Sequence, residues 1–191
     1  MKPFPETDLL SALETLKNGG TILYPTDTVW GLGCDATNFE AVQKIFAIKR
    51  RAESKSLIVL VSDYEMISHY VENIPDIAFD LIRHIEKPTT VIYSNAKNLA
   101  SNVVATDGTI GIRIVKEPFC EELIRQFGKP IVSTSANISE GGTPAMFRQI
   151  PEEVISETDY VVTYKQDIFE RAKPSTIIRL YEGGEYKIIR E

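Results

Sequence analysis

The chain has 191 residues, of which 43% are hydrophobic and 25% charged, values typical of globular proteins and not of disordered or fibrous ones. This length fits one domain with a substantial core, so we expect a single domain over residues 1–191. Lys and Arg number 21 against 27 Asp and Glu, and the net charge of −6 disfavours non-specific wrapping of nucleic acid, which depends on neutralising phosphates.

The first third of the chain predicts helices that alternate with strands. A helix is expected to begin at Thr7-Asp8 and to end at Gly19-Gly20. TILYP (21–25) predicts a short buried strand. Asn38 is expected to cap the next helix, whose C-terminal end carries the basic run 49–51. Basic residues there suit the helix dipole, so ordinary solvated charge is an alternative interpretation of this run.

The remainder of the chain predicts more strands than helices. Strands are expected at 57–61, 89–93, 110–114, 130–135 and 159–164, and helices are expected from Asp63, from Pro75 and over 118–127. A less regular stretch follows Gly141-Gly142, and two β-rich runs around EGGE (182–185) predict a terminal hairpin. Because strands and helices alternate irregularly, the pattern favours an α/β (α+β) fold, a mixed sheet covered by helices.

Several features bear on compartment and cofactors. No stretch approaches about 18 uncharged apolar residues, and MKPFPETDLL has no signal-peptide core, so we expect a cytoplasmic protein without a membrane segment. Cys34 and Cys120 are far apart and offer no zinc spacing. We expect them to be small buried residues and not catalytic thiols. His69 and His84 lie in helical-looking segments and are expected to be structural or exposed.

A glycine pattern raises the alternative of dinucleotide binding. Residues 31–36 match G-x-G-x-x-A, and Glu53 lies near where a ribose-binding acid would be expected. The context disagrees, because residues 26–30 separate the predicted strand from the first glycine and the helix signal appears only at Asn38. A Walker-type phosphate loop is absent from the sequence. Any nucleotide must therefore be bound in another way.

Four short polar stretches could together hold phosphates and a zwitterionic amino acid. Thr26–Thr28 and Ser133–Asn137 follow predicted strands, and Pro174–Thr176 opens the hairpin. Segment 44–55 carries five basic residues against one acid, which suits a compact polyanion such as a nucleoside triphosphate. Singly each stretch is weak, because hydroxyl residues after strands are usually turn formers. Nothing in the sequence resembles a Ser-His-Asp triad.

Taken in order, these blocks resemble the YrdC-like family, the threonylcarbamoyl-AMP synthases. The matching blocks are YPTDTVWGLGCDA (24–36), the K-x-R of Lys49 to Arg51, the S-x-N of Ser135 to Asn137, PSTII (174–178) and the final IIR (188–190). They span nearly the whole chain. The resemblance implies a twisted mixed β-sheet covered by helices, with a deep, positively lined cavity.

The resemblance also implies a reaction in which L-threonine, bicarbonate and ATP give threonylcarbamoyl-AMP and pyrophosphate. Mg²⁺ would be bound through the ATP phosphates and not by a metal site of the protein, and partner proteins would transfer the threonylcarbamoyl group to tRNA. The catalytic residues implied are Lys49 and Arg51. Those implied around threonine are Thr26, Thr28, Lys55, Arg113 and Ser175. Those implied around ATP are Lys49, Arg51, Thr109, Ser135, Asn137 and Arg190.

Departures from the family pattern keep other functions open. Trp30 stands where Tyr is common, Ser56 and Val115 replace prolines, and residues 86–88 replace Pro-Gly-Pro. None removes an implied ligand, yet they leave a YciO-like nucleotide- or RNA-binding protein without synthase activity as the alternative. Weak binding of double-stranded RNA or tRNA is a further alternative, against which the net charge and the single short basic cluster count. An NAD-dependent enzyme using Gly31 and Gly33 is a third.

Overall fold

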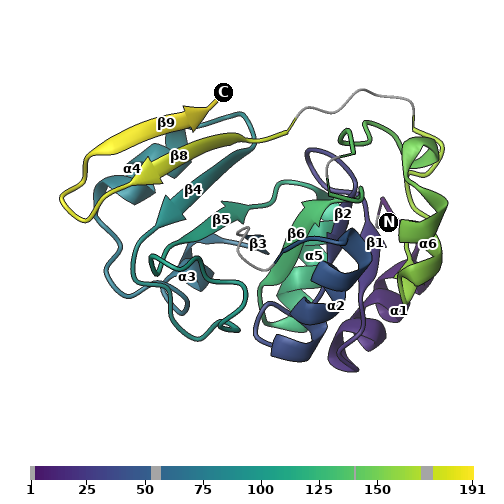
Figure 1. The fold of residues 1–191 in the computed structure, drawn as a ribbon. Helices are drawn as coiled ribbons and strands as arrows, with labels where there is room; N and C mark the ends of the chain where they lie inside the picture. Colours follow the sequence, from purple (N-terminus) through teal and green to yellow (C-terminus); the bar gives the residue numbers. More distant parts are fainter. Residues whose placement is uncertain (1–2, 53–56, 140, 169–173) are drawn as a thin grey trace.

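One mixed β-sheet runs through the structure, a computed structural model that describes residues 3–52, 57–139, 141–168 and 174–191 (Figure 1). The strands, in chain order, are β1 (Ile22–Tyr24), β2 (Gly31–Gly33), β3 (Ile58–Val61), β4 (Thr89–Tyr93), β5 (Ile110–Ile114), β6 (Ile131–Ser135), β7 (Tyr160–Val161), β8 (Thr176–Leu180) and β9 (Tyr186–Arg190). They are arranged in the order β7-β1-β2-β6-β3-β5-β4-β8-β9. The pairs β1–β7, β3–β5 and β4–β8 are parallel and the others are antiparallel, so the predicted mixed sheet is confirmed.

Helices cover this sheet unevenly. They are α1 (Glu6–Lys17), α2 (Phe39–Lys49), α3 (Tyr64–Ile67), α4 (Ile77–His84), α5 (Pro118–Phe127) and α6 (Glu152–Glu157), with a 3₁₀ turn at Phe147–Gln149. In Figure 1 the β8–β9 hairpin and α4 lie at one end of the molecule, while α1, α2, α5 and α6 gather at the other. Within the described ranges, no helix combines the length and apolar character needed to cross a membrane.

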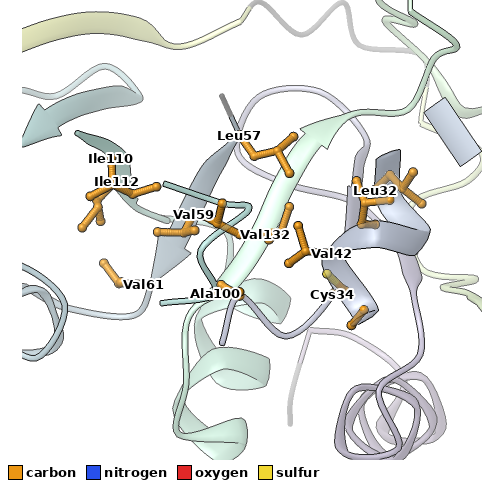
Figure 2. Close-up of a cluster of buried hydrophobic side chains, with 14 of the residues drawn as sticks. Leu32, Cys34, Val42, Leu57, Val59, Val61, Ala100, Ile110, Ile112 and Val132 are labelled. Atoms are coloured by element: carbon orange, nitrogen blue, oxygen red, sulfur yellow. The ribbon is translucent and has the colours of Figure 1, made fainter. Parts of the chain in front are cut away.

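The two faces of the sheet carry separate cores. Val59, Val61, Ile112 and Val132 face one cluster, which α2, α3 and α4 complete (Figure 2). Leu60 and Ile131 face the second cluster, which α1 and α5 complete. Both clusters follow from the two-residue period of strands, which sends alternate side chains to opposite faces.

The second face becomes polar beyond the reach of α1 and α5. Ser133 and Ser135 share the face of Ile131, and Ile58 shares the face of Leu60, because the residues within each set are two apart. On β5, Arg113 falls on this face because Ile112 points to the other core. The sheet thus presents charged and hydroxyl side chains on a part of this face that α1 and α5 do not cover. The candidate site lies on this part of the sheet.

The glycine pair of the dinucleotide-like pattern lies in a strand. Gly31 and Gly33 form the ends of β2, whereas the dinucleotide motif needs them in a strand-to-helix turn. A Cβ on Gly31 would stand 3.1 Å from Ser133 Oγ, and one on Gly33 would overlap the carbonyl oxygen of Val132. Close packing against neighbouring strands therefore explains both glycines, and the NAD-dependent alternative loses its structural basis.

Gly33→Ala is expected to lower the free energy of unfolding by roughly 1–3 kcal/mol or more, the usual range for overpacking a core. The neighbours in the way are a backbone carbonyl and the Tyr24 ring, which move less easily than a flexible side chain. Urea unfolding measures the effect. Gly142→Ala is the matched control, because no described atom lies within 4 Å of its added Cβ. Equal stability of the two variants would contradict this account of β2.

Several boundaries differ from expectation. The first helix begins at Glu6, and Asp8 is not its cap. Instead Asp8 is buried and accepts hydrogen bonds from the backbone N–H groups of Thr163 and Tyr164 and from the Tyr160 hydroxyl, so it ties α1 to the chain after β7. The expected strand at 159–164 is only Tyr160–Val161, and α6 lies in the stretch described as less regular.

Candidate functional site

A cavity of about 260 Å³ lies on the polar stretch of the sheet. It collects residues from segments far apart in sequence: the loop after β1, the end of α2, strands β4, β5 and β6, and both strands of the terminal hairpin. Six of the predicted site residues line it: Thr28, Arg51, Arg113, Ser135, Ser175 and Arg190. These six residues bring three guanidinium groups and three hydroxyls to the cavity, in line with the expected positive lining.

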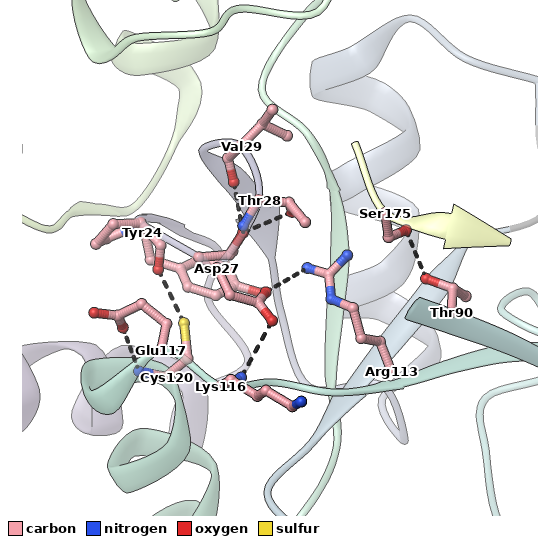
Figure 3. A network of polar contacts seen from close by, with 12 residues as sticks. Tyr24, Asp27, Thr28, Val29, Thr90, Arg113, Lys116, Glu117, Cys120 and Ser175 are labelled. Atoms are coloured by element: carbon pink, nitrogen blue, oxygen red, sulfur yellow. Dashed lines mark hydrogen bonds and ion pairs between the residues drawn. The ribbon is translucent and has the colours of Figure 1, made fainter. Parts of the chain in front are cut away.

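Arg113 is the most buried cation of the cavity. Its side chain is 3% exposed, and its Nη2 lies 3.2 Å from Asp27 Oδ1 (Figure 3). Asp27 Oδ2 also accepts a hydrogen bond from the backbone N–H of Lys116 at 3.2 Å. The buried Arg113 Nε has no hydrogen-bond partner among the described residues. Buried donors are usually satisfied, so this unpaired Nε is an exception within the described structure.

The other two arginines lie nearer the rim. Arg190 donates from Nη2 and Nε to the carbonyl oxygen of Ser175, at 2.7 and 3.2 Å. The predicted terminal hairpin is confirmed, and it returns Arg190 beside Ser175. Arg51 is half-buried, and desolvation lowers the pKa of its guanidinium. Both cations line the cavity.

The loop after β1 separates two hollows. Thr28 lines this cavity and also a second cavity of about 420 Å³, whereas Thr26 lines the second cavity and not the first. The Thr26 hydroxyl donates to the carbonyl oxygen of Val29 at 2.7 Å and also lies 3.0 Å from the Thr28 hydroxyl. Because Thr26 has only one hydroxyl proton, Thr28 must donate to Thr26 and keeps free lone pairs.

Lys49 lies behind the wall of the cavity and not on it. Only 2% of the residue is exposed, so the alternative of an ordinary solvated helix-end charge is wrong for this residue. Its Nζ donates to the carbonyl oxygens of Ser135 and Asn137, at 2.5 and 2.6 Å, and to Asn137 Oδ1 at 3.4 Å. Desolvation, with a smaller contribution from the charge of Arg51, lowers the pKa of Lys49 to about 8.

Both polar atoms of the Asn137 side chain form hydrogen bonds with residues close to it in sequence. Its Oδ1 accepts the Ser135 hydroxyl at 2.5 Å, and its Nδ2 donates to the carbonyl oxygens of Ile138 and Gly141. Asn137 thereby fixes the loop that leads to Thr143, another residue of the cavity. The K-x-R and S-x-N motifs meet in space, with Lys49 and Asn137 supporting Arg51 and Ser135.

Thr109 and Lys55, like Thr26, Lys49 and Asn137, are predicted site residues that are not placed in the cavity. Thr109 immediately precedes β5 and donates to Asp107 Oδ1 at 2.6 Å. The alternation of β5 puts Thr109 on the face of Gly111 and Arg113, but it is not among the residues that line the cavity. Lys55 lies outside the described residues.

The sequence analysis named neither Thr90 nor Thr143, and it named Asp27 and Ser133 only as members of polar stretches, without a role of their own. Asp27 carries the only charge between Ile22 and Cys34. Thr90 is the second hydroxyl of a strand that is otherwise apolar. These two features of the sequence could have marked Asp27 and Thr90 as candidates. Neither feature shows that Arg113 is the partner of Asp27 or that Ser175 is the partner of Thr90.

The second cavity offers less to a ligand. Its charged groups are engaged within the protein: Lys165 Nζ lies 3.0 Å from Glu117 Oε1, and Lys116 Nζ donates to the carbonyl oxygen of Ile85. No cluster of three or more His, Cys, Asp or Glu side chains that could hold a metal ion occurs among the described residues. The arginine-lined cavity is therefore the candidate site.

The cysteines and histidines behave as expected. Cys34 and Cys120 are buried, and burial raises the pKa of both thiols, which keeps them protonated and unreactive. The Cys120 thiol donates to the carbonyl oxygen of Pro25. His69 and His84 are exposed. None of the four lines the candidate site.

A mixed sheet with a cavity of arginines and hydroxyls on one face offers a site suited to a small anionic or zwitterionic ligand. Residues 14–191 match the family model Sua5_yciO_yrdC, which carries the description "telomere recombination". The chain therefore belongs to the Sua5/YciO/YrdC family.

Individual relatives agree with this assignment. A threonylcarbamoyl-AMP synthase from Pseudoalteromonas translucida is 33% identical over 185 residues, which are 95% of this chain and 98% of the relative. P. abyssi Sua5 complexed with L-threonine superposes with a TM-score of 0.79 at 24% identity, over 91% of this chain and 50% of that one. E. coli YciO superposes with a TM-score of 0.83 at 23% identity, over 98% and 90%. At these identities the two structures show the fold alone. This chain spans about half the length of the Sua5 chain.

Proposed function

We propose that this chain is an L-threonylcarbamoyladenylate synthase, a nucleotidyltransferase that forms threonylcarbamoyl-AMP and pyrophosphate from L-threonine, bicarbonate and ATP. The observation that carries the proposal is the buried guanidinium of Arg113, which lines a cavity together with two further arginines. The synthase name of the 33% identical relative favours this activity over the YciO-like alternative. The likeness to YciO, at 23% identity, extends to the fold alone.

Threonine fits the inner part of the cavity. Arg113 binds the carboxylate, because a charged hydrogen bond in a buried site is among the stronger ones available. Thr28 and Ser175, both nearly buried, contact the threonine hydroxyl. Lys55 remains proposed as a further threonine contact, and Thr26 supports Thr28 from behind.

ATP fits the outer part. Arg51 and Arg190 neutralise phosphate charge, and Ser135 donates to a phosphate oxygen, with Lys49 and Asn137 holding the chain beneath them. Thr109 is proposed as a nucleotide contact at the same face of β5. Mg²⁺ would be carried by the phosphates, since the described residues offer no cluster of metal ligands. It would supply further neutralisation of charge.

The chemistry follows from placing the two substrates together. The neutral amine of threonine forms a bond to the carbon of bicarbonate or of the carbon dioxide it releases, which gives a carbamate and water or a proton. A carbamate oxygen then attacks the α-phosphorus in line, and the bond to the β-phosphate bridge breaks with loss of pyrophosphate. The protein aligns the reactants and stabilises phosphate charge, which needs no covalent intermediate.

The product sets requirements on its surroundings. A carbamate and a mixed anhydride are both labile in water, so enclosure by the cavity protects them. We expect partner proteins of a tRNA-modification system to take up threonylcarbamoyl-AMP in the cytoplasm, without a stable RNA surface on this chain.

The purified protein is expected to release pyrophosphate with threonine at least about 10-fold faster than with valine at equal subsaturating concentrations. A site built for a hydroxyl leaves buried polar groups unpaired when valine binds, which costs roughly 1–3 kcal/mol. The assay combines ATP, labelled bicarbonate and one amino acid at a time, and follows labelled product and pyrophosphate. ATP binding without any product would overturn the synthase assignment. Equal rates with valine would overturn the placement of threonine.

A further inference from the structure

We propose that Thr90 is a specificity-determining positioning residue, which turns the hydroxyl proton of Ser175 into the cavity to meet the substrate hydroxyl. The inference rests on the proposed function and adds to it a residue outside the motifs that carry the family resemblance. Figure 3 shows Thr90 on β4 reaching toward Ser175, with Arg113 alongside.

The side chain of Thr90 is fixed by its surroundings. Thr90 is fully buried, and its Oγ1 lies 2.8 Å from Ser175 Oγ. Its methyl group packs over Gly111, where an added Cβ would stand 3.2 Å from Thr90 Cγ2. A β-branched side chain in a strand has few rotamers, and these two contacts define one. The hydroxyl of Thr90 therefore stays directed at Ser175.

The direction of this hydrogen bond follows from counting protons. Ser175 Oγ is the partner that the described residues give to the Thr90 hydroxyl. If Ser175 donated to Thr90, the Thr90 proton would be buried without an acceptor, which is unfavourable. If Thr90 donates, both groups are satisfied, because the Ser175 proton can point toward a ligand in the cavity.

Ser175 is also held from its other side. Arg190 binds its carbonyl oxygen through two N–H groups, so the backbone is anchored while Thr90 sets the hydroxyl. Across the cavity, Thr28 donates to Thr26 and keeps lone pairs as an acceptor. The cavity thus presents one donor, Ser175, and one acceptor, Thr28. A substrate hydroxyl, which is both donor and acceptor, matches this pair, whereas the methyl group of valine does not.

Thr90→Val tests the inference because it keeps the shape of the side chain and removes only the hydroxyl. We expect the ratio of kcat/KM for threonine to that for valine to fall about 10-fold, since the loss of one oriented hydrogen bond is worth about that factor. The KM for ATP should stay within about twofold, because Thr90 acts on the threonine part of the cavity.

Two further variants separate positioning from folding. Thr90→Ser restores the hydroxyl and is expected to recover most of the threonine preference. Thr89→Val is the matched control, because its hydroxyl donates to the carbonyl oxygen of Lys87 and does not line the cavity. Its threonine preference should equal that of the parent protein.

The possible results distinguish the inference from the proposed function. A parent protein that makes product, with an unchanged threonine preference in Thr90→Val, overturns the role of Thr90 and leaves the function standing. Parallel losses for threonine and ATP with a lower melting temperature, unrelieved in Thr90→Ser, would show a purely structural role and also overturn it. A parent protein that makes no threonylcarbamoyl-AMP overturns both.

Discussion

Arg113→Met is expected to reduce threonine affinity by roughly 10- to 100-fold and to lower the free energy of unfolding by about 3–5 kcal/mol. The first effect reflects loss of a charged hydrogen bond to the substrate carboxylate. The second arises because Asp27, with 8% of its side chain exposed, would be left as an uncompensated charge. Calorimetric titration of threonine and urea unfolding measure the two effects separately.

The double variant Asp27→Asn/Arg113→Met is the control that separates binding from stability. It removes both charges, so most of the stability should return while threonine binding stays weak. Asp27→Asn alone should keep the guanidinium but loosen its orientation. Threonine affinity of the double variant close to that of the parent protein would show that Arg113 is only a structural ion-pair partner.

Much of the fold was predictable because its signals are local. Asn38 caps α2 as expected, since its side chain accepts the backbone N–H of Ala41 three residues later. The terminal hairpin was predicted from a glycine-containing turn between β-rich runs, and α5 spans residues 118–127 as predicted. In each case the decisive residues are neighbours in sequence.

The remainder depends on contacts between distant residues. β2 is a strand of three residues with two glycines, a poor strand former by propensity, and it exists because β1 and β6 pair with it on both sides. Asp27 meets Arg113, and Thr90 meets Ser175, across 86 and 85 residues of sequence respectively. Sequence blocks indicated the ingredients of the site, while only the register of β4, β5 and β8 shows which hydroxyl faces which.

The role of Lys49, the lysine of the K-x-R motif, also could not be decided from the sequence alone. From sequence, Lys49 could be a phosphate ligand or a solvated helix-end charge. The structure instead gives its ammonium group three acceptors on the Ser135–Asn137 segment. Lys49→Met is therefore expected to reduce pyrophosphate release on the order of 100-fold, because that segment loses the group that holds it against phosphate.

The lowered pKa of Lys49 should also make the free energy of unfolding depend on pH. Its pKa falls from the usual 10.5 to about 8 in the folded protein, mainly because burial disfavours the charged form. Between these two values the unfolded chain binds more protons than the folded one, so stability contributed by Lys49 increases as pH rises through this window and is lost as pH falls through about 8. The advantage of the parent protein over Lys49→Met in urea unfolding should therefore grow with pH across that window.

Arg50→Met provides the matched control for this pH dependence. Arg50 is the neighbouring basic residue, but its side chain is 58% exposed and its ion pair with Glu157 Oε1 is long, at 3.8 Å. Removal of Arg50 should therefore leave the pH dependence of stability unchanged. ATP binding adds a second measurement: phosphate charge near Lys49 should raise its pKa, and binding near pH 8 should then take up protons. Titrations in buffers of different ionisation enthalpy detect this uptake, which Lys49→Met should reduce. A stability difference independent of pH, with undiminished proton uptake in the variant, would mean that Lys49 is charged throughout and remote from the phosphates.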